Sequence, residues 1–202
     1  MMAGTLTGMA LLLGLAAAGS GGGGARPPRT ALATFAGGCF WCMQPVFDTL
    51  DGVVRTTVGY TGGTTARPTY EQVVTGQTGH AEAIEIEYDP AKVRYEALLD
   101  IFLRNVDPTA KDRQFCDVGT QYRTAIFVHD GMQRTSAEHA LAAIARHLTI
   151  PGPPATEIVP ATTFYPAEDY HQEFHLKSPG IYESYAASCG RDQRLRQLYG
   201  DK

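Results

Sequence analysis

The chain has 202 residues, of which 44% are hydrophobic and 19% are charged, and its formal net charge at pH 7 is -4. This length and composition predict a folded domain with a sizeable core and argue against an intrinsically disordered chain. The acidic balance, with no run of five or more Lys or Arg residues, argues against a nucleic-acid-binding surface.

Residues 1–24 differ in composition from the rest of the chain. An apolar run from Met9 to Ala18 is followed by Gly19, Ser20 and four glycines. The run is too short to span a bilayer, and its small residues resemble a signal-peptidase site. We expect residues 1–24 to be a signal peptide or a flexible segment, and the protein to be periplasmic or extracellular without stable membrane association. Since the first basic residue is Arg26, a cytoplasmic protein with a low-complexity N-terminus is the alternative.

Residues 25–202 are expected to form one domain, because no repeat or linker interrupts them. In the first half of the domain, the pattern predicts a strand at 34–36, a helix at 40–50 containing Pro45, strands at 53–60 and 81–88, and a helix at 95–103. In the second half it predicts a strand at 122–128, a helix at 136–148 and a strand around Ile158. Two short helical pieces are expected in the tail. This mixture predicts an α+β fold, a mixed α/β sandwich in which helices flank a mixed β-sheet.

The segment from Gly37 to Cys42, with the sequence GGCFWC, carries the clearest chemical signal. A thiolate is the reactive form of cysteine, and the unpaired N–H groups at a helix start provide the positive potential that favours it. The aromatic rings of Phe40 and Trp41 beside Cys39 suit a small apolar group such as a thioether methyl. The segment therefore predicts a nucleophilic cysteine in an aromatic pocket.

Other readings of the same motif remain open from the residues alone. Cys39 and Cys42 match a thioredoxin-like redox pair, or buried structural cysteines. They also match half of a zinc site, with His171 and His175 spaced as the other half of a zinc-stabilised binding module.

Glu82 adds a candidate acid. It lies two, four and six positions before Ile84, Ile86 and Tyr88 in the 81–88 strand, so its side chain is expected on the same, apolar face. Burial disfavours the charged form of a carboxyl, which predicts a group that remains protonated and acts as a general acid.

Together these residues resemble the A-type peptide methionine sulfoxide reductases. The resemblance covers roughly residues 33–182, and its motifs stand in the family's order. They are Gly37-Gly38-Cys39-Phe40-Trp41, Gly59-Tyr60-Thr61-Gly62-Gly63, Pro68-Thr69-Tyr70-Glu71, Gly79-His80-Ala81-Glu82, Tyr88-Asp89-Pro90, Asp107-Pro108, Asp117-Val118-Gly119-Thr120-Gln121-Tyr122-Arg123, and Phe164-Tyr165-Pro166-Ala167-Glu168-Asp169-Tyr170-His171-Gln172. The resemblance implies a ferredoxin-like core.

It also implies a reaction. Cys39 would attack the sulfur of the S epimer of methionine sulfoxide, free or in oxidised proteins, and Glu82 would donate a proton to the departing oxygen. Tyr60 and Tyr122 would hydrogen-bond that oxygen or its adjacent water. Cys39 would become a sulfenic acid and then form an intramolecular disulfide that a thioredoxin-like dithiol reduces, with no metal or other cofactor.

The substrate-binding residues follow from the same resemblance. Phe40 and Trp41 would hold the methyl group, while Asp117 and His171 would orient the site and bind the substrate's backbone. Phe174 departs from the family, many members of which have tyrosine there, so a polar contact is expected to be missing from that wall.

The cysteine that resolves the sulfenic acid is not fixed by the resemblance. Many members have glycine at the position of Cys42 and use cysteines of a C-terminal tail. Cys42 is close in sequence to Cys39, Cys189 lies in a tail expected to be mobile, and Cys116 adjoins Asp117. We favour Cys42, followed by Cys189 and then Cys116.

Overall fold

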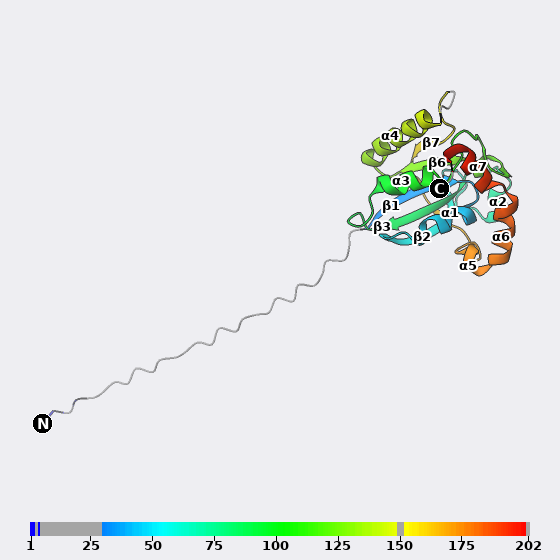
Figure 1. The fold of residues 1–202 in the computed structure, drawn as a ribbon. Coiled ribbons are helices and arrows are strands. Elements are labelled where there is room, and N and C mark those ends of the chain that lie inside the picture. The colour runs from blue at the N-terminus through cyan, green and yellow to red at the C-terminus, as the bar shows by residue number, and fades with distance from the viewer. Residues whose placement is uncertain (3, 5–29, 149–151, 201–202) are drawn as a thin grey trace.

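The computed structural model describes residues 1–2, 4, 30–148 and 152–200. Residues 30–148 and 152–200 form one α+β domain (Figure 1). The expected signal peptide or flexible segment at 1–24 falls almost wholly outside the described residues. None of the described helices is both long and apolar enough to cross a membrane.

A six-stranded mixed sheet forms the centre of the domain, with the strand order β7-β6-β1-β3-β2-β8. Its strands are β1 (Ala31–Gly37), β2 (Val53–Thr61), β3 (Ala81–Tyr88), β6 (Thr124–Val128), β7 (Glu157–Pro160) and β8 (Tyr165–Pro166). The β6–β7 pair is parallel and the other neighbours are antiparallel. A separate two-stranded ribbon joins β4 (Arg113–Gln114) to β5 (Asp117–Val118).

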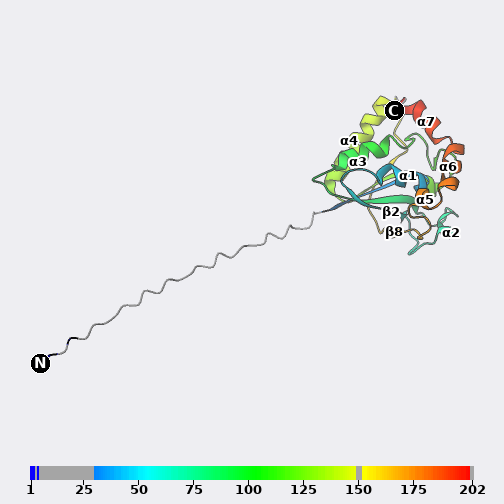
Figure 2. The same ribbon diagram turned by 60° about the horizontal axis from the view of Figure 1, so that its bottom comes forward.

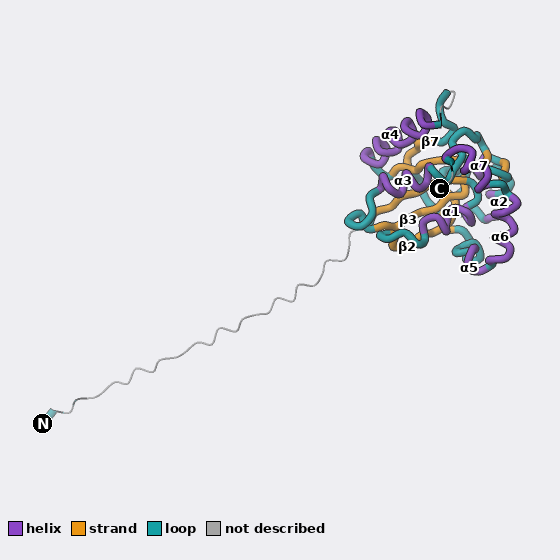
Figure 3. Tube along the Cα trace, viewed as in Figure 1, coloured by secondary structure: helices purple, strands orange, loops and turns teal. Residues whose placement is uncertain are grey.

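Seven helices and one 3₁₀ turn accompany the sheet in the described part of the chain. They are α1 (Phe40–Phe47), α2 (Tyr70–Val73), α3 (Tyr95–Leu103), α4 (Gly131–His147), α5 (Phe174–Lys177), α6 (Pro179–Ser188) and α7 (Arg191–Tyr199), with a 3₁₀ turn at Thr120–Tyr122. Figures 2 and 3 show α1, α3 and α4 on the same side of the sheet.

The main core lies between these three helices and the sheet. Phe35 of β1 stacks on Phe102 of α3, with ring centroids 4.7 Å apart, and both rings are fully buried. Ile84 and Ile86 of β3 face the same core. Because side chains alternate along a strand, Glu82 of β3 shares this face and is directed towards α1.

The predicted fold class is confirmed, and most elements lie where they were expected. The predicted helix at 40–50 ends at Phe47, and the predicted strand at 122–128 begins only at Thr124. Tyr122 belongs to the 3₁₀ turn instead, because its backbone N–H donates to the carbonyl of Gly119. Helix α4 begins at Gly131, five residues before the predicted start, since the Asp130 side chain caps it by accepting from the backbone N–H of Gln133.

Candidate active site

A glycine turn places Cys39 at the start of α1. Gly38 has a φ of +81°, and a Cβ at this position would lie 2.5 Å from the Cβ of Gln114. Glycine is therefore required both by the backbone conformation and by the packing. Cys39 is the residue that caps the N-terminus of α1, and its side chain is 9% exposed. The thiol therefore lies at the positive end of a helix, as the sequence predicts.

The carboxyl of Glu82 lies beside this helix start. Its Oε2 accepts a hydrogen bond of 3.1 Å from the backbone N–H of Phe40, the residue after the thiol. The side chain is 2% exposed. Burial raises the pKa of Glu82 to about 8, although the Phe40 hydrogen bond acts in the opposite direction. The carboxyl is therefore mostly protonated at neutral pH, which is the state a proton donor needs.

A small cavity of about 120 Å³ joins the thiol to the carboxyl. Its lining consists of Cys39, Phe40, Trp41, Tyr70, Glu82, Asp117, Tyr122 and Tyr185. Six of these were singled out from the sequence, and the structure brings them together from α1, β3, β5 and the 3₁₀ turn. Tyr70 and Tyr185 were not among them.

Tyr60 lies outside this lining. Its hydroxyl donates to Oε2 of Glu168 at 2.8 Å, and the other oxygen of Glu168 accepts from the backbone N–H of Tyr70 at 2.9 Å. The structure therefore directs the Tyr60 hydroxyl to Glu168, and Tyr122 is the tyrosine of the predicted pair that borders the cavity.

His171 contacts Trp41, one of the residues that line the cavity. The indole N–H of Trp41 donates to Nδ1 of His171 at 2.9 Å, and the imidazole is fully buried. Burial lowers the pKa of His171, so the ring is neutral and carries its proton on Nε2. Phe174 stacks on the Trp41 ring, with centroids 3.8 Å apart. The two neighbours fix the orientation of the indole plane that faces the cavity.

The thiols of Cys39 and Cys42 are free and lie within hydrogen-bonding reach of each other. Burial raises the pKa of Cys39 well above its usual value, and the hydrogen bond to Cys42 acts in the same direction. The pKa of Cys42 is lowered because its sulfur accepts that hydrogen bond and because it faces the positive charge of Arg191. Of the two thiols, Cys42 is therefore the one whose ionised form its surroundings favour. For Cys39, burial opposes the effect of the helix N-terminus from which the sequence predicts a thiolate.

The other two cysteines form a disulfide between Cys116 and Cys189, with Cα atoms 4.9 Å apart. The expectation of a mobile tail at Cys189 is therefore wrong in this structure, because the bond fastens the end of α6 to the β4–β5 turn. Beyond it, α7 is also anchored, since the Tyr199 hydroxyl donates to the Leu103 carbonyl at 2.7 Å.

Comparison with known proteins identifies the family. The family model described as peptide methionine sulfoxide reductase matches residues 31–202. The chain belongs to this family. It is 47% identical to the peptide methionine sulfoxide reductase MsrA of Bacillus licheniformis over 174 residues, covering 86% of this chain and 96% of that protein.

Solved structures of reductases show the same fold. Methionine sulfoxide reductase A of Corynebacterium diphtheriae has a TM-score of 0.71 at 36% identity, covering 77% of each chain. Mxr1 of Saccharomyces cerevisiae in its reduced form also has a TM-score of 0.71, at 32% identity, covering 77% of this chain and 89% of that one. These findings confirm the resemblance seen in the sequence, and they make the chain a methionine sulfoxide reductase of the A type.

In the part of the chain that the structure describes, the four residues of the zinc alternative do not form a metal-ligand cluster. His171 accepts from Trp41, and Nε2 of His175 lies 3.6 Å from a carboxylate oxygen of Asp48. Among the residues that the structure describes, the one group with metal-ligand geometry is Cys116, Asp117 and Cys189, in which the two sulfurs are already bonded to each other.

Four residues of the reductase site escaped the sequence analysis. Tyr185 lines the cavity and donates to Asp117 at 2.5 Å, Arg191 faces Cys42, Tyr70 lines the cavity, and Glu168 holds the hydroxyl of Tyr60. Tyr70 and Glu168 lay inside motifs that were recognised, so only their roles were missed. Tyr185 and Arg191 lie in the polar tail, where no periodic pattern marked them.

Proposed function

We propose that this reductase converts the S epimer of methionine sulfoxide, in proteins or free, into methionine, with Cys39 as the nucleophile and Glu82 as the proton donor. The observation that carries the assignment is the meeting of the two groups in one cavity, linked through the Phe40 N–H. A sulfoxide oxygen leaves readily only when it is protonated. A neutral carboxyl beside a nucleophilic sulfur meets this requirement.

The cavity walls suit the rest of the substrate. The rings of Phe40 and Trp41 offer apolar faces to the methyl group, and its volume of about 120 Å³ suits a small group. Tyr122 borders the same space and supplies a hydroxyl for the developing charge on oxygen. The Tyr60 hydroxyl could hydrogen-bond the same oxygen only if it gave up its hydrogen bond to Glu168.

Asp117 is the group we assign to the substrate's backbone. Its Oδ2 accepts from Tyr185, which leaves the second oxygen able to accept from a peptide N–H. His171 is assigned an indirect role: it orients the Trp41 ring by accepting the 2.9 Å hydrogen bond from the indole N–H.

Cys42 is the thiol we assign to resolution. Attack by Cys39 forms a sulfur–sulfur bond to the substrate while the protonated oxygen leaves as water. A water molecule then attacks the Cys39 sulfur, the sulfur–sulfur bond breaks to release methionine, and Cys39 is left as a sulfenic acid. The Cys42 sulfur then displaces that oxygen as water and forms the Cys39–Cys42 disulfide. The net reaction is two thiols plus sulfoxide giving a disulfide, methionine and water. Proximity to Cys39 and the lowered pKa of Cys42 support this order, and the bond between Cys116 and Cys189 already occupies the other candidates.

An external dithiol must then reduce the Cys39–Cys42 bond. We assign this role to a thioredoxin-like protein, and no prosthetic group takes part. Mxr1, one of the similar structures, has also been solved in complex with Trx2. Because residues 1–24 resemble a signal peptide, we further propose that the protein is exported and that its reductant acts outside the cytoplasm. N-terminal sequencing of the secreted and cytoplasmic fractions tests this, and an intact Met1 in the cytoplasm would contradict it.

Methionine yield from separated S and R sulfoxide peptides tests the main assignment. The wild type is expected to act on the S peptide alone, and Cys39→Ser to release no methionine. An insulin-reduction assay run beside it tests the alternative of a general thiol–disulfide exchange enzyme. Insulin reduction without methionine release would favour that alternative, whereas a Cys39→Ser variant with full methionine yield would refute the assigned nucleophile.

A further inference from the structure

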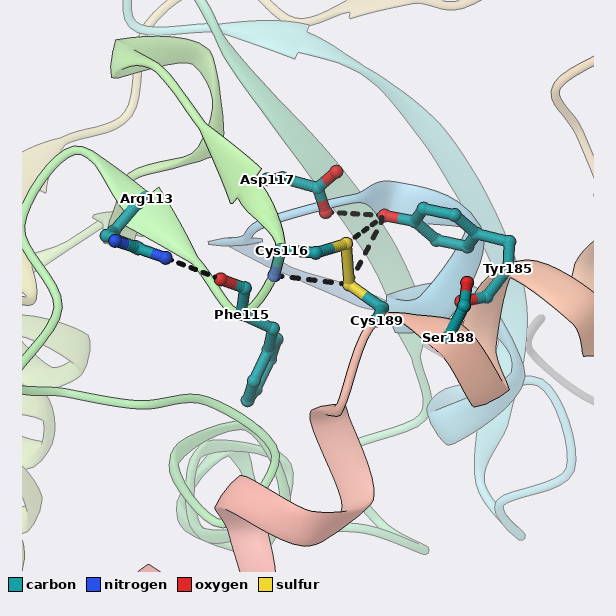
Figure 4. The surroundings of a disulfide bond; sticks show 7 residues. All are labelled: Arg113, Phe115, Cys116, Asp117, Tyr185, Ser188 and Cys189. Carbon is teal, nitrogen blue, oxygen red and sulfur yellow. Dashed lines mark hydrogen bonds between the residues drawn. A yellow bond between two sulfur atoms is a disulfide. The ribbon is translucent and has the colours of Figure 1, made fainter.

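The Cys116–Cys189 disulfide is directly connected to the cavity wall (Figure 4). Cys116 is followed by Asp117, and Cys189 lies one helical turn after Tyr185. Both Asp117 and Tyr185 line the cavity. The hydroxyl of Tyr185 donates to Asp117 at 2.5 Å and lies 4.0 Å from each disulfide sulfur. One covalent bond therefore joins the two segments whose side chains form this part of the wall.

Helix α6, which carries Tyr185, contributes no buried residue to the core. A segment with few buried apolar contacts opens locally at low free-energy cost. Besides the disulfide, Tyr185 has its hydrogen bond to Asp117 and an edge-on ring contact with Trp41, with centroids 6.0 Å apart. Each of these contributes only modestly to stability.

The turn that carries Cys116 also depends on the tail. Phe115 has a φ of +52°, in the left-handed region that non-glycine residues rarely adopt. The Arg191 guanidinium lies 4.8 Å from the centre of the Phe115 ring, and the backbone N–H of Cys116 donates to the Cys189 sulfur at 3.2 Å. Strained conformations of this kind persist where surrounding contacts hold them. The tail therefore stabilises the turn, as the turn stabilises the tail.

Tyr185 also connects the disulfide with the reacting thiol. Its hydroxyl lies within hydrogen-bonding reach of the Cys39 sulfur and 4.0 Å from each disulfide sulfur. Exchange between thiols and disulfides requires direct contact of the attacking and attacked sulfur atoms. Among the cysteines, the hydrogen-bonding partner of Cys39 is Cys42, whereas Cys116 and Cys189 are bonded to each other.

We propose that the Cys116–Cys189 disulfide stays oxidised throughout turnover and acts as a structural link that positions Tyr185 and Asp117 for binding the substrate's backbone. Electrons then pass only through Cys39 and Cys42. This inference rests on the proposed function, in which Cys42 is the resolving thiol.

The double variant Cys116→Ser/Cys189→Ser tests the link, because serine removes the bond at nearly constant volume. With a peptide S-sulfoxide and a thioredoxin as reductant, KM is expected to rise about three- to tenfold, the effect of weakening one hydrogen-bonded contact, and kcat to stay within about twofold. Tyr185→Phe is expected to raise KM by a similar factor. Adding Tyr185→Phe to the double variant is expected to change KM little further, because both changes remove the same contact.

Differential alkylation with mass spectrometry provides the second readout. In wild-type enzyme quenched during turnover, only Cys39 and Cys42 are expected to take up label, with Cys116 and Cys189 protected. An unchanged KM in the double variant overturns the inference, as does label on Cys116 or Cys189. So does a collapse of kcat with the Cys39–Cys42 disulfide accumulating, since electrons would then pass through the second pair. Failure of the proposed function looks different: the Cys42→Ser variant would keep its full rate of multiple turnover.

Discussion

Replacing Glu82 by glutamine removes a titratable proton while keeping the shape of the side chain, since the amide oxygen of glutamine still accepts from the Phe40 N–H. The pKa of Glu82 is raised from 4.5 to about 8, with burial as the main cause. The folded protein therefore holds this proton more tightly than the unfolded chain. The stability associated with it is fully present below pH 4.5 and is lost as the pH rises to about 8.

The size of the effect follows from the difference of about 3.5 between these two pKa values. Each unit corresponds to about 1.4 kcal/mol, so ionisation costs the wild type about 5 kcal/mol once the pH exceeds 8, and about 3 kcal/mol at pH 7. Glutamine has no such cost. The free energy of unfolding of Glu82→Gln minus that of wild type is expected to increase by about 1.4 kcal/mol per pH unit between pH 5 and 8.

Urea unfolding at pH 5.5, 6.5 and 7.5 measures this slope. Glu87→Gln is a matched control on the same strand, because Glu87 forms a surface ion pair with Arg55 at 3.1 Å. Loss of that pair is expected to change the free energy of unfolding by under about 1 kcal/mol. A difference between Glu82→Gln and wild type that does not vary with pH would refute the argument that this carboxyl is buried and neutral.

The same variant tests catalysis. Loss of a positioned general acid is expected to slow methionine release in a single turnover by about 10²- to 10⁴-fold at pH 7. In the wild type, the rate is expected to fall above about pH 8 as Glu82 ionises. A rate that stays constant from pH 7 to 9.5 would show that another group donates the proton.

Three further variants examine the thiol pair and the turn that presents it. Cys42→Ser is expected to release one methionine per chain and then stop, with a sulfenic acid on Cys39 that dimedone labels; a Cys39–Cys189 disulfide in this variant would contradict the assigned resolution. Arg191→Met removes the positive charge that lowers the pKa of Cys42, so the pH at which disulfide formation is half-maximal is expected to rise. Arg191→Lys keeps a positive charge and is expected to bring this pH part of the way back to the wild-type value. An unchanged pH profile in Arg191→Met would exclude this role of Arg191. Gly38→Ala is expected to destabilise the fold by about 1–3 kcal/mol in urea, because of its positive φ and the approach of Gln114, whereas Gly180→Ala, with nothing within 4 Å of its Cβ, is expected to be neutral or slightly stabilising.

The parts of the site that lie on regular elements were predictable from local pattern. Strict alternation in β3 placed Glu82 on the face of Ile84 and Ile86, and the structure buries all three. The segment from Gly37 to Cys42 indicated a thiol at a helix start, and Cys39 indeed caps the N-terminus of α1. In both cases the information lies within a few residues of the functional group.

The contribution of the tail was not predictable in this way. Helix α6 buries none of its residues, so it has no apolar periodicity that would mark Tyr185 as an inward-facing side chain. Four cysteines allow three pairings, and sequence spacing does not choose among them. Arg191 reaches the thiol pair from nearly 150 positions away along the chain, through a buried contact in which its Nη2 lies 3.2 Å from the Met43 sulfur. Such contacts depend on how the tail packs on the finished domain.

The charges in the cavity are coupled in a way that serves the reaction. The pKa of Cys39 is raised mainly by burial, and the negative charge of an ionised Glu82 would raise it further. The same repulsion acts in reverse, so a thiolate formed on Cys39 makes Glu82 hold its proton more firmly. Because Arg191 faces Cys42, one negative charge on the thiol pair is balanced, whereas a second on the carboxyl is not. The site therefore favours the state with one thiolate on the cysteine pair and one protonated carboxyl. Attack on sulfur and departure of oxygen require this same total charge, with the thiolate on Cys39.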